Sequence, residues 1–156
     1  MTPSDGPGKA QTPHDRAVLI VDDDPQDIHL VIRAFRKSGF QNPLVTVASV
    51  AEALQYLKGE APFNDRAWHP SPHLVIVDHH MRGNKVFELL EWVRRNSTFR
   101  LLPVIVFSGS EDPATEKKAL EMGANAYHVK PHDFEVFTEI VKRIGQFWLH
   151  SLTKPA

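Results

Sequence analysis

The sequence predicts an α/β fold in which a five-stranded parallel sheet lies between two layers of helices. The first observation is a set of short apolar runs rich in valine, isoleucine and leucine, typical of strands buried on both faces. The second is that helical segments follow these runs, so that strand and helix signals alternate five times. This spacing implies right-handed crossovers and a doubly wound three-layer sandwich. The usual strand order for five such units is 2-1-3-4-5.

Five apolar runs, each bounded by turn or polar residues, are expected to form the strands. In chain order they are Ala17–Val21, Leu44–Ala48, Leu74–Val77, Val104–Phe107 and Ala126–Val129.

The helices between these runs are expected from capping residues, helical spacing and terminating glycines. The last of them carries Phe134, Phe137, Ile140, Val141 and Ile144 on one face. Asp24-Pro25 precedes the first helix, which runs to about Ser38 and stops at Gly39, and the capping box Ser49-Val50-Ala51-Glu52 precedes the second, which ends at Gly59. Helical spacing over Val86–Arg95 predicts the third helix. Asp112-Pro113 precedes the fourth, which Gly123 ends, and Asp133 precedes the last.

The length of 156 residues is enough for one domain with a proper core, expected over residues 16–150. Residues 1–15 are rich in Pro, Gly, Asp and Thr and are expected to form a disordered tail, as are residues 151–156. The connection from Ala61 to Pro72 contains three prolines and is expected to be an irregular surface loop, partly pinned by Trp68.

Composition excludes several classes of function. The net charge is −1, with acids and bases interspersed, so a nucleic-acid surface is not expected. No apolar stretch approaches the length of a membrane span, and no membrane association is expected. Cysteine is absent, which excludes disulfides and thiol chemistry and fits a cytoplasmic location.

Five polar side chains lie at or just past the ends of the apolar runs. Asp22 and Asp23 follow the first run, Asp78 the third, Ser108 the fourth and Lys130 the fifth. In an open parallel α/β sheet, ligands bind at the carboxyl ends of the strands, so these residues are expected to meet at one edge. Three acids, a hydroxyl and a lysine can hold a divalent cation and a phosphoryl group together.

Four motifs resemble one family of signalling domains. They are Val-Leu-Ile-Val-Asp-Asp-Asp-Pro (18–25), Leu-Val-Ile-Val-Asp (74–78), Pro-Val-Ile-Val-Phe-Ser-Gly-Ser (103–110) and Gly-Ala-Asn-Ala-Tyr-His-Val-Lys-Pro (123–131). In order and spacing they resemble the receiver domain of two-component response regulators, over nearly everything outside the tails. The resemblance implies a flavodoxin-like (βα)5 fold. The long loop before the third strand and the segment Asn96–Arg100 before the fourth are similar to stand-alone regulators that partner bacterial and cyanobacterial phytochromes.

The resemblance implies that Asp78 accepts a phosphoryl group from a sensor histidine kinase. Asp22 and Asp23 match the acidic pair that binds Mg²⁺, an ion that takes octahedral oxygen ligands. In the family pattern Asp23 and Asp78 bind the ion directly, together with the backbone carbonyl of His80. Asp22 would act through water.

Ser108 matches the hydroxyl that turns toward the phosphoryl group, and Lys130 matches the lysine that pairs with it. Tyr127 matches the aromatic residue that swings inward when that hydroxyl moves. The Lys130–Pro131 bond is expected to be cis by resemblance. Gly109 would leave room for a phosphodonor.

Each of these residues also has a simpler structural interpretation. An acid after a strand can be a helix cap, as Asp24 before Pro25 is expected to be. Ser108 before glycine is typical of a turn, Tyr127 could belong to the core, and a lone lysine is usually solvated.

The loop after Asp78 departs from the family pattern. Arg82 stands where the family has proline, and Lys85-Val86 replace an Asp-Gly pair. The loop is therefore expected to be less rigid at position 82. The two added cations would strengthen phosphate binding, alter kinase docking or point into water.

His79 and His80 follow Asp78 directly. Adjacent residues of an extended chain point to opposite sides, so the two are poor joint ligands. A histidine metal site with His69 or His73 is an alternative. We expect instead that His80 borders the active pocket, where a bulky imidazole would slow or gate hydrolysis.

The leading interpretation is a single-domain receiver, not an enzyme beyond its own phosphorylation and dephosphorylation. Its output would be protein–protein contact or onward phosphotransfer, and a homodimer through the fourth helix, fifth strand and fifth helix is expected by family analogy. One alternative is a pseudo-receiver, a binding module that phosphorylation does not switch. A second is a phosphatase-like enzyme of related fold, in which His80 would take the place of the general acid.

Overall fold

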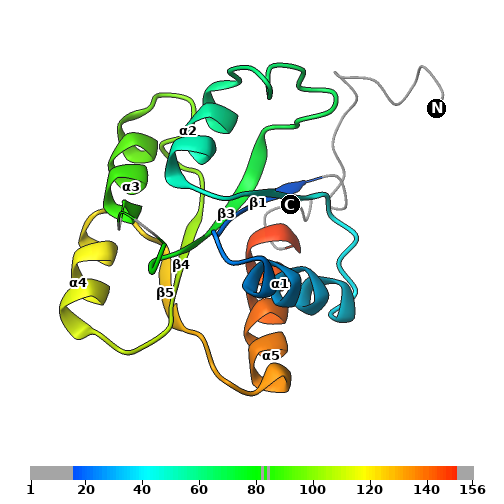
Figure 1. Cartoon of the computed structure of the whole chain (residues 1–156), viewed down its shortest axis with the longest axis vertical. Helices are drawn as coiled ribbons and strands as arrows, with labels where there is room; N and C mark the ends of the chain where they lie inside the picture. Colours follow the sequence, from blue (N-terminus) through cyan, green and yellow to red (C-terminus); the bar gives the residue numbers. More distant parts are fainter. Residues whose placement is uncertain (1–15, 82, 84, 151–156) are drawn as a thin grey trace.

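The computed structural model describes residues 16–81, 83 and 85–150. Its five parallel strands form one sheet in the order β2-β1-β3-β4-β5, which confirms the expected order and the flavodoxin-like fold (Figure 1). The expected tails, residues 1–15 and 151–156, lie outside the described residues, and so does Arg82. The strands are β1 (Ala17–Val21), β2 (Leu44–Val47), β3 (Pro72–Asp78), β4 (Val104–Ser108) and β5 (Ala126–Val129).

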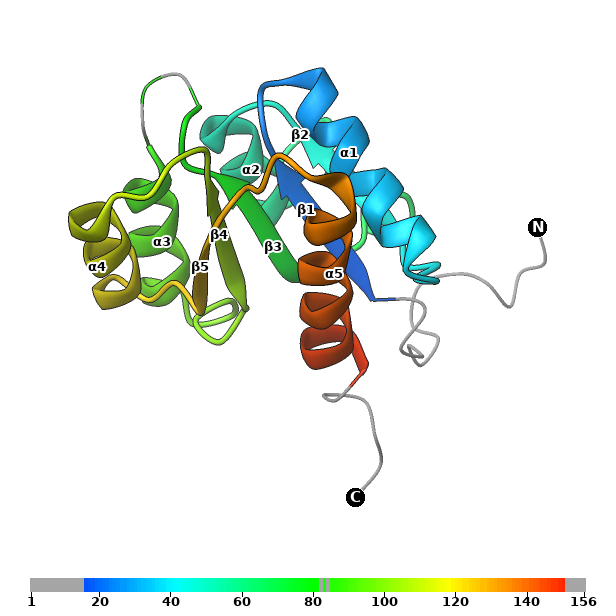
Figure 2. The same ribbon diagram turned by 90° about the horizontal axis from the view of Figure 1, so that it is seen from below.

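Helices cover both faces of the sheet. The first and last helices lie side by side on one face and the other three cover the opposite face (Figures 1 and 2). Across the described residues, no helix combines the length and the apolar character needed to span a bilayer. The helices are α1 (Pro25–Lys37), α2 (Val50–Lys58), α3 (Val86–Arg95), α4 (Pro113–Glu121) and α5 (Phe134–Gly145), which a π-helical segment, Gln146–His150, continues.

The central strands send alternate side chains into two separate cores. On β1, Leu19 and Val21 pack with residues of α2, α3 and α4, whereas Val18 and Ile20 pack with residues of α1 and α5. β3 and β4 divide their side chains in the same way. Burial on both faces explains why these runs lack polar alternation, and it fixes the register that places the strand ends at one edge.

The expected helix caps are present. The side chains of Asp24, Ser49, Asp112 and Asp133 each accept a hydrogen bond from a backbone N–H in the first turn of the helix that follows. The strand ends differ from the prediction, because β3 extends from Pro72 through Asp78 and β4 includes Ser108. Asp78 and Ser108 are therefore strand residues, held by the sheet itself.

The loop between α2 and β3 is held by Arg66 and Tyr56. The Arg66 guanidinium donates to the Leu57 carbonyl at 2.8 Å, and the Tyr56 hydroxyl donates to the Pro70 carbonyl at 2.8 Å. Trp68, in contrast, is 74% exposed. The expectation that Trp68 pins the loop is therefore wrong, since hydrogen bonds to backbone carbonyls do so.

One prolyl bond also differs from what the resemblance implies. Among the described residues the cis peptide bond is Ala61–Pro62, and Lys130–Pro131 is trans. The expectation of a cis bond after Lys130 is wrong, and the bond has the isomer that X–Pro pairs generally favour.

Candidate functional site

The carboxyl ends of four strands bring together most of the predicted site. Asp22 follows β1, Asp78 ends β3, Ser108 ends β4 and Lys130 follows β5. The Lys130 ammonium lies 3.3 Å from Asp22 and 3.5 Å from Asp78, which confirms that these groups meet. Asp23 is exposed and borders a separate pocket with Ser49, Gly83 and Lys85, and it does not belong to the group of carboxylates that meet.

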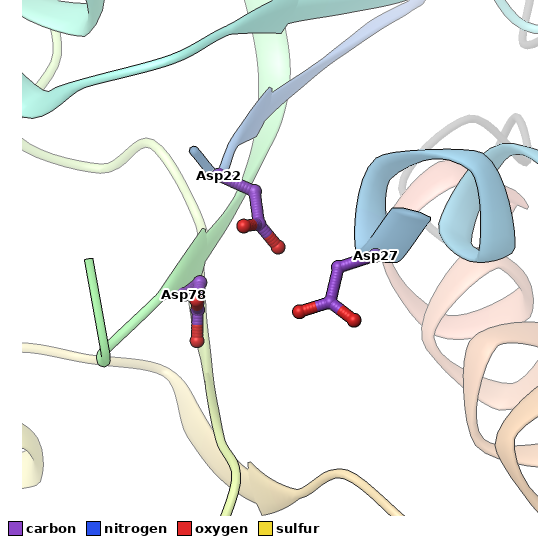
Figure 3. Close-up of side chains that lie close together, drawn as sticks. All are labelled: Asp22, Asp27 and Asp78. Atoms are coloured by element: carbon purple, nitrogen blue, oxygen red, sulfur yellow. The ribbon is translucent and has the colours of Figure 1, made fainter. Parts of the chain in front are cut away.

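A third carboxylate, Asp27, completes the acidic group. Oxygens of Asp22, Asp27 and Asp78 all lie within 4.8 Å of one another, and Figure 3 shows the three side chains close together. Asp27 comes from the first turn of α1, where an acid is usually explained by the helix dipole. Sequence reasoning missed it for that reason. The available signal was its position in the first turn of a helix that begins three residues after Asp22, at the same sheet edge.

Lys130 is the cation that these acids share. Its side chain is 18% exposed, and its Nζ lies 2.8 Å from Asp27 Oδ2, the shortest of its three ion pairs. Burial lowers the pKa of Lys130, but the hydrogen bond to Asp27 and the charges of Asp78 and Asp22 outweigh burial and raise it overall. The lysine therefore stays charged inside the site.

Asp22 is the most buried acid of the group, at 3% exposure. Burial raises its pKa to about 6, although the Asp24 N–H that it accepts at 3.0 Å and the nearby Lys130 lower the value. The charges of Asp78 and Asp27 raise it further. Three carboxylates against one ammonium leave an excess of negative charge, so the site is suited to a divalent cation with oxygen ligands.

Ser108 is held by His80. Its hydroxyl donates to the Ser110 carbonyl at 2.9 Å, and His80 Nε2 lies 2.9 Å from the same oxygen. Because the hydroxyl hydrogen is used by Ser110, the imidazole N–H is the donor to Ser108. His80 therefore lies beside Ser108 at the carboxyl edge of the sheet, and its effect on hydrolysis stays a prediction.

The His80 ring also covers Gly109. A Cβ built on this glycine would lie 3.5 Å from His80 Cδ2. The space that Gly109 was expected to leave for a phosphodonor is therefore bounded by imidazole in this conformation.

The other histidines of the described residues do not form a group that could hold a metal ion. His79 is buried against Phe87, and burial together with the charge of His80 lowers its pKa. His69 packs against Tyr56 and Phe63, away from the sheet edge. No histidine belongs to a group of potential ligands in the part of the chain that the structure describes, and the alternative of a histidine metal site is not supported.

Tyr127 lies half-buried on β5 and packs against the core on the α2, α3 and α4 side. Its hydroxyl is buried and has no hydrogen-bond partner among the described residues. A buried hydroxyl without a hydrogen-bond partner costs free energy, so a change in its surroundings that offers a partner would favour movement of this side chain.

A pocket of about 360 Å³ adjoins the charged group between α1 and α5. Asp27 and Lys130 form its polar side, and Leu30, Val31 and Phe137 contribute apolar walls.

Comparisons with known proteins agree with this geometry. The family model of the response regulator receiver domain matches residues 18–142. Response regulator Rcp1 of Synechocystis sp. is 23% identical over 141 residues, which cover 90% of this chain and 94% of Rcp1. Its Mn²⁺-bound structure superposes with a TM-score of 0.77 at 23% identity, covering 90% of this chain and 99% of that one, and shows the same fold.

Two further solved structures are similar over almost their whole length. The phosphorylated cyanobacterial phytochrome response regulator RcpA gives a TM-score of 0.80 at 27% identity, covering 91% of this chain and 99% of RcpA. RPA3017, a response regulator in red light signalling of R. palustris, gives a TM-score of 0.81 at 28% identity, covering 90% of this chain and 99% of RPA3017.

Proposed function

The chain belongs to the response regulator receiver domain family, and we propose that it receives a phosphoryl group on Asp78 from a sensor histidine kinase of the phytochrome type. The observation that carries the proposal is the meeting of Asp78, Lys130 and Ser108 at the carboxyl edge of the sheet. The phytochrome partner is supported by the likeness to RcpA, a phytochrome response regulator, and to RPA3017, which acts in red light signalling.

The transfer is a nucleophilic displacement at phosphorus. A carboxylate oxygen of Asp78 attacks the phosphorus of a phosphohistidine, and a P–O bond forms as the P–N bond breaks. The electron pair of that bond returns to the imidazole nitrogen, and Asp78 becomes a mixed anhydride. The approach of two anions needs positive charge nearby, which Lys130 supplies from 3.5 Å.

We propose that Mg²⁺ is the cofactor. The acidic group of Asp22, Asp27 and Asp78, whose oxygens lie within 4.8 Å of one another, suits such an ion by its charge and its oxygen donors, and Asp22 and Asp78 would hold it. The Mn²⁺-bound form of Rcp1 supports divalent-cation binding in this fold. When bound, the ion supplies charge neutralisation for the phosphoryl oxygens. Direct ligation by Asp23 and by the His80 carbonyl stays a prediction.

The output in this proposal is protein–protein contact or onward phosphotransfer, with a homodimer through α4, β5 and α5. Leu120 on α4 and Val136 on α5 are 44% and 50% exposed, which gives this face apolar side chains for contact. The proposal includes a cytoplasmic location, no binding of nucleic acid or membrane, and no enzymatic activity beyond the protein's own phosphorylation and dephosphorylation.

The pseudo-receiver remains a second candidate, because the His80 hydrogen bond holds the Ser108 hydroxyl in place. Incubation with acetyl phosphate and Mg²⁺, followed by intact mass measurement, separates the two. We expect one phosphoryl group on the wild type and on Glu135→Gln, which changes an exposed acid paired with Lys37 outside the site. Asp78→Asn should not be labelled. A wild type without label, or equal labelling of Asp78→Asn, would reject phosphorylation at Asp78.

A further inference from the structure

Asp27 holds the Lys130 ammonium more closely than the acid to be phosphorylated does. The separation between Nζ and carboxylate oxygen is 2.8 Å for Asp27 but 3.5 Å for Asp78. Asp27 reaches the lysine from α1, whereas Asp78 reaches it from the sheet. In the structure the lysine therefore lies toward α1.

This pair is not an ordinary surface ion pair. Lys130 and Asp27 have side-chain exposures of 18% and 32%, and both line the pocket whose walls include Leu30, Val31 and Phe137. Apolar walls lower the local dielectric, which strengthens a hydrogen-bonded ion pair relative to one in water. The structure thus gives Lys130 a strong partner that is not the phosphorylation site.

Phosphorylation of Asp78 would increase the negative charge that Lys130 must pair with. It replaces the single negative charge of the Asp78 carboxylate by a phosphoryl dianion, and Lys130 is the cation that pairs with Asp78 among the described residues. The lysine must therefore give up contact with Asp27, or share it, when the phosphoryl group arrives.

We propose that Asp27 is a positioning residue for the phosphoryl transfer, which acts by holding Lys130 away from Asp78 in the unphosphorylated protein. This role rests on the proposed function. Asp27 lowers the rate at which Asp78 takes up a phosphoryl group, because the donor must compete with Asp27 for the lysine. The release of Lys130 from Asp27 is then part of the change that accompanies phosphorylation.

The test compares the wild type with Asp27→Asn, Asp27→Glu and the net-charge control Glu135→Gln. Removal of the Asp27 charge should raise the second-order rate constant for labelling by acetyl phosphate about tenfold, the effect of one charge-assisted hydrogen bond. Asp27→Glu keeps the charge and should restore the slow rate. Glu135→Gln removes the same charge elsewhere and should label at the wild-type rate.

A second measurement follows the pair without phosphorylation. In metal-free protein, the ¹H–¹⁵N signal of the Lys130 ammonium reports whether that group is hydrogen-bonded. We expect this signal to shift or vanish in Asp27→Asn and to be unchanged in Glu135→Gln. An unchanged signal, or an unchanged labelling rate, would overturn the positioning role.

Mg²⁺ binding by calorimetry separates this role from metal ligation. If Asp27→Asn labels more slowly than the wild type and loses as much Mg²⁺ affinity as Asp22→Asn, Asp27 is a ligand and the proposal is wrong. If the wild type is not labelled at all, the proposed function fails and the positioning role in it fails too. The ammonium signal would then still show whether Asp27 and Lys130 form a pair.

Discussion

The imidazole of His80 donates a hydrogen bond to the hydroxyl of Ser108, with 2.9 Å between Nε2 and Oγ. His80 is two residues beyond the proposed phosphorylation site, and its ring also lies over Gly109. One exposed side chain thus holds the hydroxyl expected to respond to phosphorylation and covers the approach beside it.

Replacement of His80 should shorten the lifetime of the phosphorylated protein. His80→Ala removes the ring that lies against Ser108 and Gly109. If this ring limits the access of water to Asp78, hydrolysis in the variant should be on the order of tenfold faster, equivalent to about 1.4 kcal/mol. His80→Gln, which keeps bulk and an N–H donor, should decay more nearly like the wild type. Intact mass measured over time gives the lifetimes. Equal lifetimes for wild type and His80→Ala would show that the imidazole does not control hydrolysis.

Asp22 should make stability depend on pH. Its pKa is raised from 3.8 to about 6 in the folded protein, mainly by burial, so the folded state holds this proton more tightly than the unfolded state does. The resulting stabilisation is complete below pH 3.8 and is lost as pH rises through 6. In metal-free protein at pH 8, the free energy of unfolding of Asp22→Asn should therefore exceed that of the wild type by up to roughly 3 kcal/mol.

Chemical denaturation across pH measures this difference, which should shrink toward zero as the pH falls below 4. Saturating Mg²⁺ should stabilise the wild type and have little effect on Asp22→Asn, because ligand binding to the folded state adds stability. An Asp22→Asn variant that is no more stable than the wild type at pH 8 would contradict the cost assigned to burial of this carboxylate.

Arg94 is expected to support the fold without taking part in the site. From the end of α3 its guanidinium donates to the carbonyls of Gly123 and Leu102, at 2.6 and 2.7 Å, and so joins the segments that lead into β5 and β4. Arg94→Ala should lower the free energy of unfolding by roughly 2–4 kcal/mol.

The neighbouring Arg95 provides the control for Arg94, because it is 79% exposed and lies 3.9 Å from Glu91. Arg95→Ala should change stability by no more than about 0.5 kcal/mol. Both variants should still accept phosphate on Asp78. Loss of labelling in a folded Arg94→Ala protein would show that the arginine also matters to the site.

The α4, β5 and α5 face should mediate self-association after phosphorylation. Val136→Glu places a charge on this face and should leave the phosphorylated protein monomeric in sedimentation at micromolar concentration. Leu101→Glu introduces the same charge at an 82% exposed position before β4 and should not change association. A phosphorylated wild type that stays monomeric would exclude this mode of output.

The sequence predicted the strands and four of the converging side chains because these depend on short-range signals, whereas the strand order was expected from the usual arrangement of five such units. Strand runs buried on both faces and their carboxyl ends determine where Asp22, Asp78, Ser108 and Lys130 lie. Asp27 could not be found in this way, since an acid in a first helical turn is common for local reasons.

Side-chain partnerships were also beyond the sequence. The contact between His80 and Ser108 depends on how the chain turns after β3, and periodicity says nothing about that turn. The same limit applies to the loop before β3, where Trp68 suggested an anchor but Arg66 and Tyr56 provide it.

Asp78 and Ser108 end strands buried on both faces, whereas His80 and Asp27 come from a turn and from the start of a helix. Substitutions at His80 or Asp27 can therefore occur without any change in the strands that hold Asp78 and Ser108. In the proposed function, such substitutions would change the lifetime of the phosphorylated state while Asp78 and Ser108 keep their positions. Proteins that share this fold could in this way respond to slow or fast stimuli with the same hydrophobic core.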